Sequence, residues 1–391
     1  FVFACIWAFG SAVFSDKSGN TRVEFSDWWK RVFTTVKFPA NGTVYDYFVD
    51  ASGQLVPWTS ILENYVPPPD AYLVTQVFVP TVESVRLRYL LDLLVDRGRP
   101  ALLVGGAGTG KTKLILEYLQ GVRVRDERKV FANINVNYYT DAKALQRILE
   151  SHIDKRAGRI YGPVGNKKLI YLIDDLNMAQ VDTYGTQSAM QLIKQQMDYG
   201  FWYDTTKLEK KEVRDVQFLA CMNPTAGSFV VSDRLQGMFA TFAIAMPDNA
   251  ELRAIYGAVM RAHLQDFTRG TDAMLVELGE SIVKATVDLY DIVATKFLPS
   301  TKKFHYQFNL RDLSAIMQGI CMMQPKQLYT PKMFVQLWQH ECSRVFSDRL
   351  VDSKDIQQFE GLLEIKSRDH FKRILQPEGG SLDSAESIPD F

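Results

Sequence analysis

The sequence predicts an α/β domain, with a parallel sheet flanked by helices, followed by a smaller all-α domain. Three observations predict this fold class. A glycine-rich segment of the form G-x-x-x-x-G-K-T lies between an expected strand and an expected helix. Expected strands and helices alternate from residue 71 to residue 248, and strand signals stop after Pro247.

Length and composition fit a folded chain of several domains. The chain has 391 residues, of which 47% are hydrophobic, so it can build two or three cores. Its 45 basic and 45 acidic residues give a formal net charge of zero, which disfavours a nucleic-acid binder. Its four cysteines and five histidines show no metal-ligand spacing, and so few cysteines favour a reducing, cytoplasmic compartment.

Residues 1–70 form an aromatic-rich segment, expected to be a linker from a preceding module. Its first fourteen residues, FVFACIWAFGSAVF, carry no charge, lack a basic leader and are too short to span a bilayer. We expect a buried helix there, and its packing partner can lie upstream. A second helix is expected in EFSDWWKRVF, and the prolines at 67–69 form a natural boundary. No membrane association is expected.

The α/β domain is expected over residues 71–248. Thr81 is a suitable N-cap for a helix in VESVRLRYLLDLLVDRG, and Thr140 for one in TDAKALQRILESHIDK. Further helices are expected in KTKLILEYLQG, ending at Gly121, and in SAMQLIKQQMDYG. The expected strands are PALLVGG, KVFANINVN, LIYLIDDL, VQFLACMNP and FATFAIAMP.

Residues 249–372 are expected to form the all-α domain, and residues 373–391 a linker toward a following module. The helical segments are ELRAIYGAVMRAHLQDF, DAMLVELGESIVKATVDLYDIVATKFL, LRDLSAIMQGICMM, PKMFVQLWQHECSRVFSDRLV and SKDIQQFEGLLEIKSRDHFKRIL. The final PEGGSLDSAESIPDF is polar and contains glycine, serine and proline, as linkers do.

The glycine-rich segment predicts a phosphate-binding loop. Its residues are Gly105, Gly106, Ala107, Gly108, Thr109, Gly110, Lys111 and Thr112. Glycines let backbone N–H groups turn toward a phosphate, and the start of the following helix adds a favourable dipole. Lys111 is expected to reach the β- and γ-phosphates of ATP or ADP, and Thr112 to bind Mg²⁺.

A pair of carboxylates follows the apolar strand LIYLI, in the manner of a Walker-B segment. Asp174 is expected to hold Mg²⁺. Asp175 is expected where a base orients the attacking water. The alternative for this segment is a buried strand that ends at a polar turn.

Together, these segments and the helical domain resemble the AAA+ family. The resemblance implies that Asn223 senses the γ-phosphate, that Arg311 is a second sensor, and that Arg234 is an arginine finger for a neighbouring module. The alternatives are a turn for Asn223 and surface positions for the two arginines. Hydrolytic AAA+ sites usually have Glu where Asp175 stands, so the shorter side chain predicts slow hydrolysis.

An adenine contact is expected from Val77, Phe78 and Val79, which precede the first helix of the α/β domain. The three residues form an apolar stretch suitable for packing against a base. Packing within a hydrophobic core is the alternative for each of them.

Longer segments resemble the third AAA+ module of an axonemal dynein heavy chain of the outer-arm type. They are FVFACIWAFG, EFSDWWKRVFTTVKFP, YGPVGNKKLIYLIDDLNMAQVDTYGTQ, FLACMNPTAGSFVVSDRLQ, FHYQFNLRDLSAIMQGI and LWQHECSRVFSDRL. Met178-Ala179-Gln180 departs from the Met-Pro that relatives often have. The resemblance implies a ring of six modules that drives microtubule sliding, in which the third has a regulatory nucleotide site.

The partners implied are adjacent modules of the same heavy chain, other dynein chains, and a microtubule bound through the full-length motor. The implied location is the cytoplasmic cytoskeleton of a cilium or flagellum, in the axoneme. Three alternatives stay open: a non-hydrolysing module that holds nucleotide as a structural part, a module of another AAA+ remodelling ATPase, and an unrelated P-loop kinase.

Overall fold

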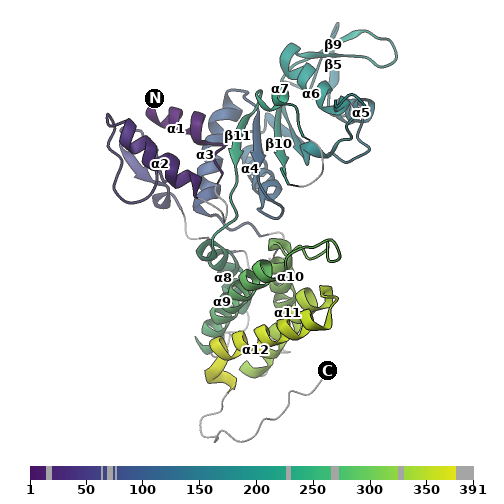
Figure 1. The fold of residues 1–391 in the computed structure, drawn as a ribbon. Coiled ribbons are helices and arrows are strands. Elements are labelled where there is room, and N and C mark those ends of the chain that lie inside the picture. Colours follow the sequence, from purple (N-terminus) through teal and green to yellow (C-terminus); the bar gives the residue numbers. More distant parts are fainter. Residues whose placement is uncertain are drawn as a thin grey trace, which may run out of the picture. The chain divides into compact units, whose positions relative to one another are not determined.

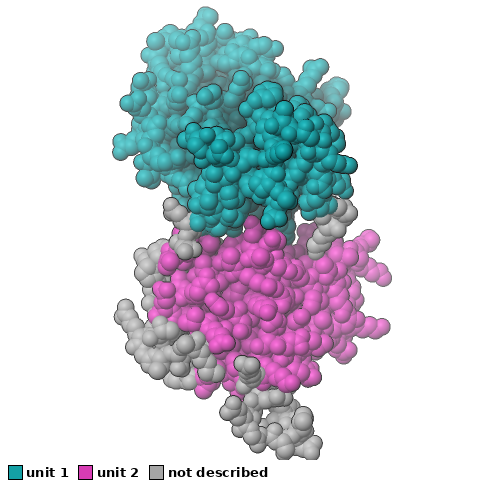
Figure 2. Space-filling view, turned by 90° about the vertical axis from the view of Figure 1, so that its left-hand side faces the viewer, with its two compact units in different colours: residues 1–63, 80–246 teal, residues 64–79, 247–391 magenta. Residues whose placement is uncertain are grey.

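The chain folds into two units, which are coloured separately in Figure 2. Unit 1 contains residues 1–63 and 80–246, and unit 2 contains residues 64–79 and 247–391. The computed structural model describes residues 1–14, 20–62, 65–67, 74, 77–225, 230–265, 273–324 and 330–375. The division differs from the predicted ranges, because residues 1–63 join the α/β unit and residues 64–79 join the helical unit. Most of the expected C-terminal linker lies outside the described residues.

A five-stranded parallel sheet forms the centre of unit 1 (Figure 1). Its strands are β3 (Ala101–Val104), β4 (Lys129–Asn135), β7 (Lys168–Asp174), β10 (Val216–Met222) and β11 (Ala240–Ala243). Their order in the sheet is β11-β3-β10-β7-β4. The parallel sheet predicted from the sequence is therefore confirmed. Strand β10 lies between β3 and β7, which places the ends of these three strands side by side.

The apolar strands form this sheet because both of its faces are covered. Tyr171 in β7 and Phe218 in β10 are buried and stack with ring centroids 5.5 Å apart. The hydroxyl of Tyr171 also donates to the carbonyl of Leu149, over 2.6 Å. Burial raises the pKa of Tyr171, so this hydroxyl stays protonated as a donor.

The helices within residues 80–246 flank the sheet (Figure 1). They are α3 (Val82–Asp96), α4 (Lys111–Arg125), α5 (Ala142–Glu150), α6 (Ser188–Tyr199) and the short α7 (Asp233–Gln236). Thr81 caps α3 as predicted, accepting from Ser84 N. The predicted cap Thr140 is wrong, because Asp141 caps α5 by accepting from Ala144 N over 2.6 Å. The predicted end of α4 at Gly121 is also wrong, since the helix continues to Arg125.

A second, four-stranded sheet in unit 1 was not predicted. It consists of β5 (Asp154–Ala157), β6 (Ile160–Gly162), β8 (Phe201–Tyr203) and β9 (Lys210–Val213), in the order β5-β6-β9-β8. Its strands are short and come from two separate insertions in the α/β sequence. Trp202 anchors the sheet: it is completely buried and donates from Nε1 to the Glu150 carboxylate over 2.8 Å.

The N-terminal residues pack onto the α/β part of unit 1. They form α1 (Val2–Gly10), α2 (Thr21–Val32), a hairpin of β1 (Tyr47–Val49) and β2 (Leu55–Pro57), and a 3-10 turn, η1 (Trp58–Ser60). Trp7 of α1 packs edge-on against Tyr45, with centroids 5.4 Å apart, and Ala243 N of β11 donates to Ser11 O over 2.9 Å. The other face of the helix is open, since Phe9 is 73% exposed. The helix is therefore only half buried.

Helices form the described part of unit 2 (Figure 1). They are α8 (Asn249–Gln265), α9 (Ala273–Lys296), α10 (Leu310–Cys321), α11 (Pro331–Phe346), the 3-10 turn η4 (Ser347–Arg349) and α12 (Ser353–Leu375). The helical fold predicted for this region is therefore confirmed. Trp338 lies in its core and donates to Thr286 Oγ1 over 2.8 Å. Among the described residues, no helix has both the length and the apolar character needed to cross a membrane.

Candidate nucleotide-binding site

The glycine-rich loop connects β3 to α4, as predicted. Strand β3 ends at Val104, and α4 begins at Lys111. Gly105 lies between the neighbouring strands, where its N–H donates to Met222 O over 3.2 Å. A Cβ atom at Gly105 would lie only 2.6 Å from the carbonyl of Ile244. Glycine is therefore required at the base of the loop by the close approach of backbone.

Two glycines give the loop its turn. Gly108 has a φ angle of +79° and Gly110 one of +83°, both in the left-handed region that side chains disfavour. Between them, Thr109 turns its hydroxyl back to donate to Gly106 O over 3.1 Å. Gly110 stands as N-cap of α4 with no side chain to satisfy the first N–H groups. The start of α4 is thus suited to an anion.

Lys111 lies within this loop. Its ammonium donates to the carbonyls of Gly105 and Gly106 over 2.8 and 2.7 Å, and to Thr109 Oγ1 over 3.3 Å. The side chain is 9% exposed. A largely buried cation that faces a concave backbone loop can exchange these carbonyls for phosphate oxygens.

Thr112 and Asp174 meet at the carboxyl edge of the sheet. Thr112 Oγ1 donates to Asp174 Oδ1 over 3.0 Å, although the residues come from α4 and β7. A hydroxyl and a carboxylate oxygen are the hard ligands that Mg²⁺ prefers. Within the described residues, no group of three His, Cys, Asp or Glu side chains could hold a metal alone. This pair therefore fits a metal ion that takes its other ligands from phosphates and water.

Asp175 follows Asp174 in a left-handed conformation, with φ +54° and ψ +48°. Asp tolerates this region better than most residues do. Its N–H donates to Asp174 Oδ1 over 3.1 Å, and its side chain is exposed. The turn thus separates the two carboxylates: one lies beside Thr112, and the other is open to solvent.

Asn223 follows β10, the strand between those of the loop and the carboxylates. Thr225 fixes its side-chain orientation, because both its N–H and its hydroxyl donate to Asn223 Oδ1, over 3.1 and 2.9 Å. None of the described residues accepts from Asn223 Nδ2. Asn223 thus follows the strand that lies between the strands of the loop and of Asp174.

Sequence reasoning missed Asn177. This residue is 4% exposed and donates from Nδ2 to the backbone carbonyl of Asn223 over 2.9 Å. The available signal was an asparagine between Leu176 and Met178, two residues after the acidic pair. A buried polar side chain among apolar neighbours needs a hydrogen-bond partner.

The two predicted arginines belong to other elements. Arg234 is exposed on α7, which Leu235 anchors by complete burial, and no described residue pairs with its guanidinium. Arg311 is exposed in the first turn of α10 in unit 2, where Asn309 accepts from its N–H over 2.8 Å. The expected N-cap Asn309 is therefore confirmed.

The three residues expected to contact adenine belong to unit 2. Val77, Phe78 and Val79 are half-buried, and the two valines pack against the hydrophobic core of the helical unit. Packing within a hydrophobic core, the alternative for these residues, thus accounts for part of the surface of the two valines. The structure brings together the loop, Lys111, Thr112, Asp174, Asp175 and Asn223 within unit 1.

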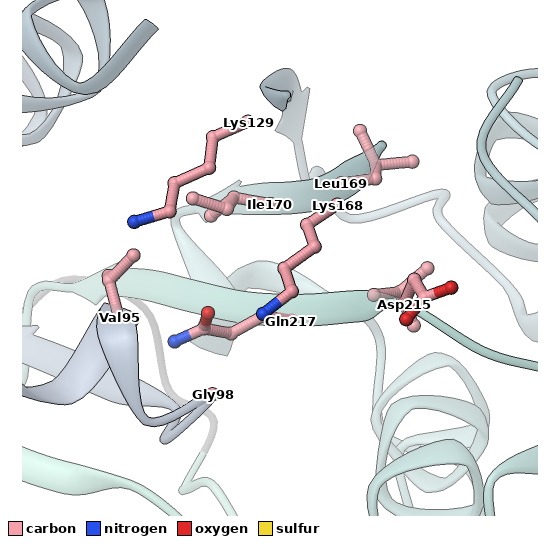
Figure 3. A pocket seen from close by; sticks show the side chains of 9 residues that line it. Val95, Gly98, Lys129, Lys168, Leu169, Ile170, Asp215 and Gln217 are labelled. Atoms are coloured by element: carbon pink, nitrogen blue, oxygen red, sulfur yellow. The ribbon is translucent and has the colours of Figure 1, made fainter. Parts of the chain in front are cut away.

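A separate hollow opens at the opposite edge of the main sheet (Figure 3). It encloses about 190 Å³ and is lined at the amino ends of β4, β7 and β10, among others by Lys129, Lys168 and Gln217. Lys129 pairs with Asp96 over 2.7 Å, and Gln217 donates to Arg99 O over 2.7 Å. This hollow lies away from the glycine-rich loop, because parallel strands place the loop at their carboxyl ends.

Comparisons with known proteins identify the family of this chain. Residues 66–247 match the family described as "P-loop containing dynein motor region". Residues 1–60 match the "Dynein heavy chain AAA lid domain", and residues 282–377 the "AAA+ lid domain". The chain is 45% identical over 375 residues to "Dynein beta chain, ciliary" of Tripneustes gratilla, and 42% identical over 361 residues to "Dynein beta chain, flagellar outer arm" of Chlamydomonas reinhardtii.

The chain belongs to the axonemal dynein heavy chain family. The two alignments cover 96% and 92% of this chain but 8% of each relative. It is also 42% identical over 356 residues to "Dynein axonemal heavy chain 17" of Homo sapiens, covering 91% of this chain and 8% of that one. The AAA+ fold is thereby confirmed: the dynein P-loop region and its lid match the α/β and helical parts.

Proposed function

We propose that this dynein region binds ATP or ADP with Mg²⁺ at residues 105–112 and regulates the motor cycle of its heavy chain, with slow hydrolysis. The observation that carries the proposal is the contact of Thr112 Oγ1 with Asp174 Oδ1 at 3.0 Å, directly beside the loop. The contact joins the two expected Mg²⁺ ligands from elements far apart in the sequence. A glycine-rich turn without a ligand gives no reason for this contact.

Each residue of the loop has a distinct task in the proposal. Backbone N–H groups at residues 106–112 donate to phosphate oxygens, and Lys111 moves its ammonium from the loop carbonyls to the β- and γ-phosphates. Thr112 and Asp174 hold Mg²⁺, which neutralises phosphate charge when bound. Asn223 Nδ2 donates to the γ-phosphate or to the attacking water.

Slow hydrolysis follows from the position of Asp175. A base must lie within hydrogen-bond reach of the water that it activates. Asp is one methylene shorter than the Glu usual at this position, and a retreat of roughly one ångström costs on the order of a hundredfold in rate. Nucleotide binding depends on other side chains and is expected to persist.

The remaining site residues act from other elements in this proposal. Arg311 is a second sensor that reaches the γ-phosphate from the helical lid. Arg234, exposed and without an ion-pair partner in the described chain, serves the nucleotide of a neighbouring module. Val77, Phe78 and Val79 offer their remaining apolar surface to adenine.

We further propose that this region is the third AAA+ module of an axonemal outer-arm heavy chain. Residues 1–60, which match a dynein AAA lid, are then the lid of the preceding module. The partners are adjacent modules, other dynein chains, and microtubules bound through the whole motor. The ciliary and flagellar names of the relatives support a location in the axoneme.

A second candidate function is a module that holds nucleotide without hydrolysing it. The left-handed backbone of Asp175 and the exposure of its side chain to solvent favour this alternative. Both candidate functions predict nucleotide binding at this site, but only the first predicts hydrolysis there.

Site-specific photo-crosslinking tests the proposal. The full heavy chain is labelled with 8-azido-ADP, and the labelled peptides are identified by mass spectrometry. The proposal predicts labelled peptides from residues 71–248 that disappear in the Lys111→Ala variant and persist in Lys168→Ala. Labelling that is absent, or equal in the wild type and Lys111→Ala, would contradict it.

A further inference from the structure

Asn177 connects two parts of the site that are distant in sequence. It lies in η2 (Leu176–Met178), the 3-10 turn that follows Asp175. Its Nδ2 donates to the backbone carbonyl of Asn223, over 2.9 Å, from a side chain that is 4% exposed. A buried hydrogen bond therefore joins the turn after β7 to the end of β10.

The turn that carries Asn177 is itself well fixed. Leu176 is completely buried, and Met178 N donates to Asp175 O over 2.9 Å. Asp175 N in turn donates to Asp174 Oδ1 over 3.1 Å. A change in the position of Asn177 therefore requires a change in the turn of Asp175.

Asn177 holds the backbone carbonyl of Asn223, and Thr225 holds its side chain. Thr225 donates to Oδ1 and so prevents the Asn223 amide from turning by itself. The direction of Nδ2 therefore changes only if the whole residue changes its orientation. A buried carbonyl that loses its donor incurs a desolvation cost and tends to rotate toward another partner. Such a rotation would move Nδ2 away from the loop edge.

We propose that Asn177 is a positioning residue, which holds Asn223 so that its Nδ2 can recognise the γ-phosphate, and which couples this contact to the turn of Asp175. The inference rests on the proposed function of the loop. It predicts that loss of the Asn177 side chain lowers the affinity of the site for ATP relative to its affinity for ADP. It predicts little effect on ADP itself, which has no γ-phosphate to contact.

The test compares two competitors of 8-azido-ADP labelling in the full heavy chain: ADP and the non-hydrolysable analogue AMP-PNP. In Asn177→Leu, a change of similar shape, we expect AMP-PNP affinity to fall about fivefold while ADP affinity stays within about twofold, as for one lost hydrogen bond. Asn223→Ala should produce a similar fall. The double variant should lose no more than either one, because both act through a single contact.

Gln187 provides a matched control. It is also a buried amide, 5% exposed, and donates from Nε2 to a backbone carbonyl, that of Ala179, over 2.9 Å. Gln187→Leu removes a bond of the same kind without touching Asn223. The ratio of AMP-PNP to ADP affinity should therefore stay at the wild-type value in this variant.

A second substitution, Asn177→Ala, guards against misfolding because it removes the donor without adding charge or bulk at this buried position. The inference is overturned if the affinity ratio is unchanged in both Asn177 variants. It is also overturned if both affinities fall in parallel together with the melting temperature, as a purely structural role predicts. Failure of the proposed function is a different result, since wild-type labelling would then not depend on Lys111.

Discussion

The two edges of the main sheet in unit 1 are both polar, yet they differ in how their charges are arranged. At the amino edge, Lys129 pairs with the exposed Asp96 beside a hollow. At the carboxyl edge, Lys111 is largely buried in a backbone loop, and Thr112 meets Asp174. A hollow alone thus does not identify a site. Polar groups that converge and fit one ligand indicate a binding site more strongly than a hollow does.

Removal of the loop ammonium should give the largest difference between the edges. Lys111→Ala is expected to weaken nucleotide binding about a hundredfold, because charge-assisted bonds to phosphate are lost. Lys168→Ala at the amino edge is the matched control and should leave binding unchanged. Competition for 8-azido-ADP labelling measures both. Equal losses in the two variants would remove the distinction between the edges.

The rate of hydrolysis at the carboxyl edge should depend on the length of the side chain at position 175. Asp175→Glu extends the carboxylate and is expected to raise hydrolysis at this site about tenfold or more. Single-turnover hydrolysis of nucleotide bound at this module measures the effect, with Asp215→Glu at the amino edge as control. An unchanged rate, with Asn223 and Arg311 intact, would show that the missing methylene does not limit the site.

Loss of a proposed Mg²⁺ ligand should weaken nucleotide binding less than loss of Lys111 does. Thr112→Val keeps the shape of the side chain but removes the hydroxyl, and we expect Mg²⁺-dependent binding to weaken about fivefold. Binding measured in EDTA should be almost the same in variant and wild type. Comparison of labelling with and without Mg²⁺ tests this. A loss of equal size in EDTA would argue that Thr112 acts through packing alone.

The smallest effect is expected from the ion pair beside the hollow. Lys129 lowers the pKa of Asp96 by donating to it, so the pair stabilises the fold at neutral pH and the contribution disappears as the pH falls through that lowered pKa. Since Asp96 is 64% exposed, solvent screening limits the loss in Lys129→Ala to at most about 1 kcal/mol. Urea unfolding at pH 7 and pH 3 measures it; a loss that grows at pH 3 would contradict the account.

The sequence predicted the elements whose pattern is local. The run LIYLIDDL revealed a central strand and the carboxylates after it, and the glycines of the loop revealed their turn. The sheet of β5, β6, β8 and β9 was missed because its strands have only three or four residues each and come from two insertions that are distant in the sequence. Asn177 was missed because the sequence shows an asparagine after the acidic pair but does not show its partner, the backbone carbonyl of Asn223.

The most direct test is to determine the structure of the full heavy chain purified without added nucleotide and to inspect residues 105–112. The account predicts an adenine nucleotide whose phosphates lie against the N–H groups of the loop, with Lys111 turned from the carbonyls of Gly105 and Gly106 to the phosphate oxygens. An empty loop that stays empty at saturating Mg-ADP, with Lys111 still bound to those carbonyls, would contradict it.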